Sequence, residues 1–357
     1  MVGRLGTLSA CLSSVLFNRR WLVLAAGACL ATLASRALLR RSRQFEFAGT
    51  TVLIAGGSRG MGLVLARQLI DAGARVAILA RTSADLQAAR QELQARGGDV
   101  LAMQCDVGQP EEVQSAVQQV LERFGGVDVL FNFAGVIQVG PLESMTREDF
   151  HRAMDVHFWG ALNTTLEVLP DMRGRGWGRI VNVASLGGKR AVPHMLPYTA
   201  SKFALVGLSN GLRTELTKDG ILVTTVIPSL VRTGSTRNAL FKGQHRKEHA
   251  WFSIAGALPG VAMSAERAAA QIVRACRDGE REVLLRHPAN LAVALQSFFP
   301  GLTQSLLGVI ARVLPRMGGI GTRSAYGYES ASRWSPSLLT RSGDAAARRN
   351  NEMGRRA

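Results

Sequence analysis

The chain has 357 residues, of which 47% are apolar and 19% are charged, and it contains 38 glycines. This composition excludes an intrinsically disordered chain, a collagen and a coiled coil, and it supplies enough apolar side chains for a sizeable core. The four cysteines, at positions 11, 29, 105 and 276, have neither a paired nor a metal-ligand spacing. The sequence therefore predicts no disulfide framework and no metal site, and it favours a reducing compartment.

Most of the formal net charge of +17 lies at the two ends of the chain. Residues 1–45 contain seven arginines and no acidic residue, and residues 317–357 contain seven arginines against three acidic residues. The middle of the chain is only mildly basic, so we expect no nucleic-acid partner. Arginines beside apolar segments favour contact with anionic lipid instead.

Residues 1–45 are predicted to form a basic, apolar membrane anchor. Residues 21–39 are apolar except for Thr32, Ser35 and Arg36, and paired arginines flank them on both sides. Crossing a bilayer takes about 20 apolar residues, so the length is borderline, although Arg36 can snorkel to the interface. A secretory signal and an organelle transit peptide are the alternatives.

Between residues 46 and 290, apolar strand patterns alternate with helical patterns. Strands are predicted at 51–55, 75–80, 100–106, 127–131, 178–183 and 221–227. Helices are predicted at 63–70, 82–96, 111–124, 146–172 and 198–218, and a Thr-x-x-Asp capping pattern opens the second. This alternation predicts one doubly wound α/β domain, a Rossmann-type parallel sheet with helices on both faces.

Two further segments follow this domain. Residues 291–321 are predicted to form an apolar helical extension, which Pro300 and Gly301 divide into two helices that are each too short to span a membrane. An interfacial hairpin, a cover over the substrate mouth and core packing are all open for it. Residues 322–357 are rich in Ser, Arg, Gly and Ala, and they are predicted to form a disordered basic tail.

A glycine-rich turn joins the first strand to its helix. It reads Ala-Gly-Gly-Ser-Arg-Gly-Met-Gly over residues 55–62, at the place where a dinucleotide pyrophosphate binds a helix N-terminus. Gly56, Gly60 and Gly62 allow the backbone to approach the phosphates and the helix to pack on the strand. A glycine-rich turn without a ligand is the alternative.

The second strand ends at Arg81, where an NAD enzyme would place an acidic side chain against the ribose 2′-hydroxyl. Arg59 and Arg81 instead favour NADP, because guanidinium groups suit a 2′-phosphate. Two solvated surface arginines are the alternative. Asp106, after the third strand, is predicted either to contact the adenine amine or to cap the next turn.

Tyr198 and Lys202 are four residues apart on a predicted helix, so their side chains share one face. The ammonium group is expected to move the pKa of Tyr198 toward neutrality, as a general acid/base requires. Ser185 follows a strand thirteen residues earlier, and its hydroxyl is expected to hold a substrate oxygen.

Together these motifs resemble the short-chain dehydrogenases/reductases over about residues 48–285. The resemblance rests on Gly56-x-x-x-Gly60-x-Gly62, Asn132-Phe133-Ala134-Gly135, Ser185 and Tyr198-x-x-x-Lys202. It implies hydride transfer to a carbonyl carbon, or the reverse, with Tyr198 protonating the oxygen. The predicted cofactor-binding residues are Gly56, Ser58, Arg59, Gly60, Met61, Gly62, Arg81, Asp106, Asn132, Ala134, Gly135, Tyr198, Lys202, Pro228 and Thr233.

His157 departs from the family pattern, which usually has an Asn there to complete a proton-relay tetrad. The Asn acts largely through a backbone carbonyl that holds a water molecule, and His also has that carbonyl, so we expect activity to be retained. A His packed in a kinked helix is the alternative to a relay role. Ala55, Phe133 and Ser229 are milder departures.

Residues 230–263 form a long connection at the place where this family keeps its substrate lid. The segment mixes apolar side chains such as Phe241 and Trp251 with basic ones such as Lys242. This mixture suits a lipid-like carbonyl with an acidic head, or a lid resting on a bilayer; a solvated loop is the alternative. His194 borders the same pocket, and a surface position is expected for it.

The sequence thus predicts an NADP-dependent oxidoreductase that interconverts a hydrophobic ketone or aldehyde and its alcohol. The alternative is a cofactor-binding regulatory protein with weak turnover owing to His157. The expected partners are a small-molecule substrate and membrane lipid, and a homo-oligomer stays open. Because a nicotinamide enzyme gains little from export, the catalytic domain is expected on the cytoplasmic side of a membrane, with organelle targeting by residues 1–45 as the alternative.

Overall fold

The computed structural model describes residues 40–257, 262–285, 287–338 and 340–353, together with residues 24, 27, 31, 35 and 38. The chain divides into two units, Met1–Phe45 and Glu46–Ala357. Most of the predicted N-terminal anchor lies outside the described residues. Among the helices that are described, none is by itself long and apolar enough to cross a bilayer. The bent pair Asn290–Phe298 and Pro300–Val313, with 117° between its helices, meets that requirement only when taken together.

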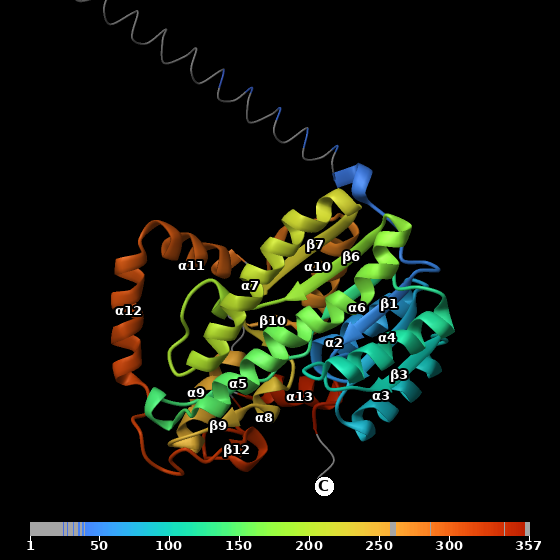
Figure 1. Cartoon of the computed structure of the whole chain (residues 1–357). Helices are drawn as coiled ribbons and strands as arrows, with labels where there is room; N and C mark the ends of the chain where they lie inside the picture. Colours follow the sequence, from blue (N-terminus) through green and yellow to red (C-terminus); the bar gives the residue numbers. More distant parts are fainter. Residues whose placement is uncertain are drawn as a thin grey trace, which may run out of the picture. The chain divides into compact units, whose positions relative to one another are not determined.

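A seven-stranded parallel sheet organises the larger unit (Figure 1). Its strand order is β11-β7-β6-β4-β1-β2-β3, which reverses direction between β1 and β4. The predicted doubly wound parallel sheet is confirmed. Ligands of such sheets bind at the carboxyl ends of the strands beside the reversal point. The strands are β1 Thr51–Ala55, β2 Arg75–Ala80, β3 Val100–Gln104, β4 Val129–Asn132, β6 Gly178–Val183, β7 Ile221–Pro228 and β11 Glu282–Leu285.

Helices pack on both faces of this sheet, so the central strands are almost entirely buried. The main core includes Leu53, Leu130 and Ile180 of the strands and Val117 and Val168 of two helices, each at most 2% exposed. The covering helices are α2 Gly60–Asp71, α3 Ser83–Ala95, α4 Pro110–Phe124, α6 Gly160–Arg175, α7 Leu196–Leu216 and α10 Ala265–Arg277. The sequence patterns predicted neither α10 nor β11.

The long helix predicted over residues 146–172 is broken in the structure. It consists of α5 Arg147–Met154, a π-helical turn Asp155–Trp159, and α6. The Gly160 N–H donates to the Asp155 carbonyl, five residues back, which widens the helix around His157. This turn supplies the kink that one interpretation of His157 requires.

The predicted lid is folded rather than a solvated loop. It contains β8 Val231–Arg232, α8 Ser235–Asn238, β9 Leu240–Phe241, α9 His245–Ala257 and β10 Met263–Ser264. A small second sheet joins β9 to β5 Gln138–Val139 and to β12 Ala325–Tyr326. Lys242, predicted to offer positive charge to a substrate, is buried and pairs with Asp149. Its charge is therefore neutralised inside the fold.

The C-terminal part of the chain folds onto the same unit. Pro300 separates α11 His287–Phe298 from α12 Pro300–Val313, as the sequence predicted. The prediction of a disordered tail from residue 322 is wrong, because β12, a 3₁₀ turn Gly327–Glu329 and α13 Arg341–Arg349 follow. Small residues allow close packing here: a Cβ on Gly234 would lie only 2.4 Å from the Cβ of Ala347. A composition rich in small residues therefore reflects close contact rather than disorder.

Candidate active site

The glycine-rich turn lies where the strand order reverses. Gly56 has φ +92°, and a Cβ there would lie 2.7 Å from the Ala134 nitrogen. A Cβ on Gly62 would lie 2.1 Å from the Gly56 carbonyl oxygen. Neither position can carry a side chain in this fold. The turn thus presents backbone to the carboxyl edge of the sheet, and α2 begins there at Gly60.

Arg59 and Arg81 extend from the same edge of the sheet. An Arg59 Nη1 lies 3.3 Å from Asp85 Oδ2, and an Arg81 Nη1 lies 3.7 Å from Asp106 Oδ2. The two arginine side chains are 40% and 50% exposed, so both can still reach an incoming anion. Asp106 also accepts a 3.0 Å hydrogen bond from the Gly108 N–H. It caps its turn, which is the second of its two predicted roles.

Asp85 belongs to the predicted capping pattern of α3, but its carboxylate faces Arg59 instead. Within the described residues, the Thr82 side chain makes no capping hydrogen bond. Burial raises the pKa of Asp85, and the Arg59 charge opposes that rise. The acidic residue at this helix start therefore belongs to the electrostatics of the glycine-rich turn.

Asn132 holds strands together. Its side-chain amide donates to Asn182 Oδ1 at 2.9 Å, and its carbonyl oxygen accepts from the Thr164 hydroxyl at 2.7 Å. The residue is 5% exposed. Its side chain thus positions β4 against β6 and α6. The backbone of Ala134 lies against Gly56 of the glycine-rich turn, and Gly135 lies beside His157.

Ser185 follows the carboxyl end of β6, and Tyr198 and Lys202 lie in the first two turns of α7. The Tyr198 ring and the Ser185 hydroxyl group lie side by side: a Cβ on Gly187 would be 3.2 Å from Tyr198 Cε1 and 3.5 Å from Ser185 Oγ. Lys202 Nζ donates to the Val183 carbonyl at 2.9 Å and lies 5.8 Å from the Tyr198 ring centroid. A Cβ on Gly188 would lie 2.6 Å from the Lys202 carbonyl oxygen, so glycine is required where the loop crosses α7.

Burial dominates the electrostatics of these three residues. It raises the pKa of Tyr198, and the hydrogen bond from Ser185 opposes this in part. It also lowers the pKa of Lys202 to about 7. The expected effect of the lysine on Tyr198 is therefore outweighed by desolvation. At neutral pH Tyr198 retains its proton, as a proton donor must.

His157 is locked in place by both ring nitrogens. Its Nε2 accepts from the Val136 N–H at 3.1 Å, so the ring proton is on Nδ1, which donates to Ser201 Oγ at 2.7 Å. Ser201 in turn donates to the Tyr198 backbone carbonyl at 2.9 Å. Burial and the charge of Lys202 hold the pKa of His157 well below its usual value. The imidazole therefore positions Tyr198, and the geometry favours the packed histidine over a relay through the ring.

An apolar wall borders Tyr198. The ring packs against a cluster of buried side chains that β5, β9, α9 and the loop before α7 supply: Val139, Met195, Ala239, Phe241 and Phe252, with Ile137, Val192 and Trp251 beside them. The lid thus contributes aromatic side chains to the apolar cluster that holds Tyr198.

His194 is half-buried rather than on the surface, with 10% of its side chain exposed. Its Nδ1 lies 2.8 Å from Glu248 Oε1, and Trp251 Nε1 donates to Glu248 Oε2 at 2.6 Å. Glu248 is completely buried. Sequence reasoning did not single out Glu248, although Glu248 and Trp251 share a helix face at a spacing of three. This cluster ties the loop before Tyr198 to the lid.

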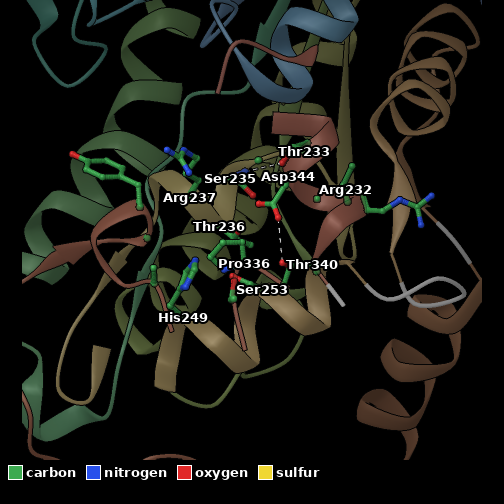
Figure 2. Close-up of a pocket in the computed structure, with 18 residues that line it drawn as sticks. Arg232, Thr233, Ser235, Thr236, Arg237, His249, Ser253, Pro336, Thr340 and Asp344 are labelled. Atoms are coloured by element: carbon green, nitrogen blue, oxygen red, sulfur yellow. Dashed lines mark hydrogen bonds between the residues drawn. The ribbon is translucent and has the colours of Figure 1, made fainter. Parts of the chain in front are cut away.

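A polar cavity of about 70 Å³ opens beside Thr233, between the lid and the C-terminal segment (Figure 2). The Thr233 hydroxyl accepts from the Ser235 N–H at 3.1 Å. Figure 2 shows the Asp344 side chain directed toward Thr233 and Thr340, and Arg232 directed away from the cavity. The C-terminal segment thus lines one side of this cavity, and the loop that follows Pro228 lines another.

Sequence reasoning missed one group of residues at the glycine-rich turn. The Gly60 N–H donates to the Asn350 carbonyl at 2.8 Å, and the Asn351 side chain donates to the Ser58 carbonyl at 3.0 Å. Since residues 322–357 carry little periodicity, no signal in the sequence indicated this contact.

Comparison with known proteins places the chain in a family. A family model described as short chain dehydrogenase matches residues 50–242. A putative ketoacyl reductase of Streptomyces coelicolor is 39% identical over 183 residues, which cover 51% of this chain and 70% of that protein.

Solved structures show the same fold. A short chain dehydrogenase/reductase from Burkholderia phymatum in complex with NAD has a TM-score of 0.67 and 27% identity, and the match covers 72% of this chain and 96% of that one. Actinorhodin polyketide ketoreductase with NADPH has a TM-score of 0.60 and 31% identity over 66% of this chain and 95% of that one. This chain therefore belongs to the short-chain dehydrogenase family of oxidoreductases.

Proposed function

We propose that the protein is an NADP(H)-dependent oxidoreductase that interconverts a hydrophobic ketone or aldehyde and its alcohol. The observation that carries this proposal is the proximity of Ser185, Tyr198 and Lys202, with the Tyr198 ring packed against an apolar cluster. The similar ketoreductases support carbonyl reduction as the reaction class.

The glycine-rich turn fits a dinucleotide. Positions 56 and 62 leave no room for a Cβ, and the first turn of α2 offers backbone N–H groups to a phosphate. Similar proteins bind NAD or NADPH, so the family alone does not select between the two. Arg59 and Arg81, both partly exposed beside the turn, support NADP(H).

The protein's own groups handle the proton. When bound, the cofactor supplies the hydride for reduction or accepts it for oxidation. In reduction, the Ser185 hydroxyl donates a hydrogen bond to the carbonyl oxygen, and Tyr198 transfers its proton to that oxygen as the alcohol forms. Lys202, in its protonated form below a pKa of about 7, stabilises the phenolate that remains. In oxidation the Tyr198 phenolate takes the proton back.

The lid supports a substrate that is apolar next to its carbonyl group. Phe241, Phe252 and Trp251 lie in the cluster that contains Tyr198. Lys242 is paired with Asp149, so it offers no charge to an acidic head group. We therefore propose an uncharged hydrophobic group next to the reacting carbon.

The direct test is NADPH consumption by the full chain with a panel of apolar ketones and aldehydes. We expect turnover with apolar members and none in a Tyr198→Phe variant. A protein that binds NADPH but turns over no member of the panel would support the alternative, a cofactor-binding regulatory protein.

We also propose that the protein attaches to a bilayer surface, with its catalytic unit on the cytoplasmic side. Leu302, Leu306 and Val313 of α12 follow one another at helical spacing and are 69%, 59% and 83% exposed. Phe298 of α11 is 77% exposed. These exposures argue against core packing and support an interfacial hairpin. The proposed N-terminal anchor, residues 1–45, would provide a second attachment in addition to this hairpin.

A further inference from the structure

The segment after α13 lies on the glycine-rich turn. The Gly60 N–H lies at the start of α2, where backbone amides have no acceptor within the helix. It donates instead to the Asn350 carbonyl at 2.8 Å. The Asn351 side-chain amide donates to the Ser58 carbonyl at 3.0 Å and to the Asp85 carbonyl at 3.1 Å. The segment thus contacts the predicted phosphate-binding turn and the start of α3 next to it.

Glu352 places an acid between this turn and the Thr233 loop. Its Oε1 lies 3.1 Å from the position that a Cβ on Gly60 would take, and the Gly234 N–H donates to its carboxyl group. Its Oε2 has no hydrogen-bond partner among the residues that the structure describes, although Glu352 is only 4% exposed. A buried acidic group at a helix N-terminus occupies the kind of place that a phosphate takes.

The environment of Glu352 is poorly suited to a carboxylate. Burial raises its pKa to about 8, although the Arg59 charge and the Gly234 N–H both oppose the rise. Near neutral pH the docked group therefore carries a proton. This explains how an acid can remain in a buried place with one unpartnered oxygen.

Arg67 on α2 holds the segment from outside the turn. Its guanidinium donates to the Arg349 carbonyl at 2.8 Å and to Asn350 Oδ1 at 3.1 Å, while Glu92 pairs with it at 2.6 Å. On the other side, the Asn238 side chain donates to the Glu352 carbonyl at 3.0 Å. The segment is therefore docked at both ends by specific hydrogen bonds.

We propose that residues 350–352 are a tethered competitor of the cofactor, which fill the phosphate end of its site and leave when the dinucleotide binds. This inference rests on the proposed NADP(H)-dependent function. The Gly60 amide cannot donate fully to both the Asn350 carbonyl and a phosphate. The Glu352 carboxyl group also fills space at this helix N-terminus, 3.1 Å from the position that a Cβ on Gly60 would take, so a phosphate could not lie there at the same time. Docking therefore weakens cofactor binding. The apparent dissociation constant equals the intrinsic constant divided by the fraction of molecules in which the segment is released.

The test is the dissociation constant of NADPH, measured by fluorescence titration of the full-length protein. Arg67→Gln removes the clamp on the segment, and Asn351→Ala removes its bonds to the turn; neither residue belongs to the catalytic or cofactor-binding groups. We expect each variant to bind NADPH about tenfold more tightly, the value for a site that is free in a tenth of molecules. Arg173→Gln, which breaks a surface pair with Asp219, is the matched control and should leave the constant unchanged.

A second measurement follows the segment itself. Arg348 and Arg349 are exposed, so trypsin can report whether the segment stays docked. We expect saturating NADPH to speed cleavage there several-fold in the wild type, and to have little effect in Arg67→Gln, where the segment is already released.

The outcomes separate the two proposals. Equal or weaker NADPH binding by both variants, or protection of Arg349 by NADPH, overturns the competitor and leaves the oxidoreductase proposal intact if turnover still depends on Tyr198. If neither the wild type nor any variant binds NADPH, both the competitor proposal and the oxidoreductase proposal are overturned. Tighter binding by the variants together with faster cleavage supports the competitor.

Discussion

At the scale of single residues, Tyr198 is the only group in the candidate site that the proposed mechanism uses as a proton donor. Tyr198→Phe keeps the ring in its cluster and removes the hydroxyl group. We expect turnover to fall by at least ~10²-fold, a typical contribution of general acid catalysis, with NADPH binding nearly unchanged. Steady-state rates and a binding titration check this. Wild-type rates in the variant would show that another group supplies the proton.

Lys202 gives the second prediction at this scale, because burial lowers its pKa from the usual 10.5 to about 7. Between these values the unfolded chain binds the proton and the folded chain does not, so folded stability rises with pH. Compared with a Lys202→Met variant, the wild type should gain about 2 kcal/mol between pH 7 and pH 9.

Urea unfolding of both proteins at the two pH values measures this difference. Glu352 contributes with the opposite sign: its pKa is raised to about 8, so the folded state loses stability as the pH rises from 4.5 to about 8. Both proteins contain Glu352, so this contribution cancels when the wild type is compared with Lys202→Met. A difference that stays constant with pH would show that Lys202 remains charged in the folded protein.

His157→Asn tests the histidine. Because the imidazole only positions Ser201 and Tyr198, we expect kcat to remain within about tenfold of the wild type, which is ~1.4 kcal/mol in the barrier. A rise of ~10³ in kcat would show instead that His157 weakens the enzyme, and would favour the regulatory alternative.

At the scale of elements, the turn between β1 and α2 carries the choice of cofactor. Arg59→Ala together with Arg81→Ala removes both guanidinium groups. A hydrogen bond to a charged group contributes roughly 1.5–3 kcal/mol, and the exposure of these side chains reduces that value. We therefore expect about a tenfold weaker NADPH affinity and little change for NADH. Arg96→Ala, an exposed arginine on the neighbouring helix segment, serves as the control.

A uniform loss for both cofactors would mean that the two arginines support the turn rather than a 2′-phosphate. Titrations of both dinucleotides with the same protein preparation decide between these outcomes, since a damaged turn weakens both equally.

The elements differ in how far the sequence predicted them. Strands such as β1 and β7 are short runs of mostly apolar, β-branched residues, so the sequence pattern alone located them within a few residues. The π-helical turn at His157 was missed because it depends on packing, such as the approach of Gly160 to Val107. β11 was missed because it is short and its first three residues are only half-buried.

The candidate site shows the same division. Gly56, Ser185, Tyr198 and Lys202 stand in local motifs, so the spacing of these residues along the chain is informative by itself. The pairing of half-buried His194 with buried Glu248 is a contact between residues 54 apart in the chain. The contact of Asn350 with Gly60 joins opposite ends of the catalytic unit. Long-range contacts of this kind leave no periodic signal in a single sequence.

At the scale of the whole molecule, membrane attachment would combine two apolar segments. The apolar run at residues 21–39 is the longer one and contains no proline, so we expect it to be the main anchor. Without residues 1–45, the unit Glu46–Ala357 should move mostly to the soluble fraction at moderate salt. Retention of this unit on membranes at high salt would place the main anchor at α11 and α12 instead.

The smaller contribution of the helical hairpin can be measured on that unit alone. We expect residues 46–357 to bind vesicles that contain one third phosphatidylserine weakly, and the variant Leu302→Ser, Leu306→Ser, Val313→Ser to lose this binding. Each of these side chains is more than half exposed, so serine should cost little folding stability. Leu166→Ser, on α6 and 52% exposed, is the control for loss of an exposed apolar side chain elsewhere. Equal vesicle binding by the triple variant and by the control would mean that the exposed face of α12 does not meet lipid.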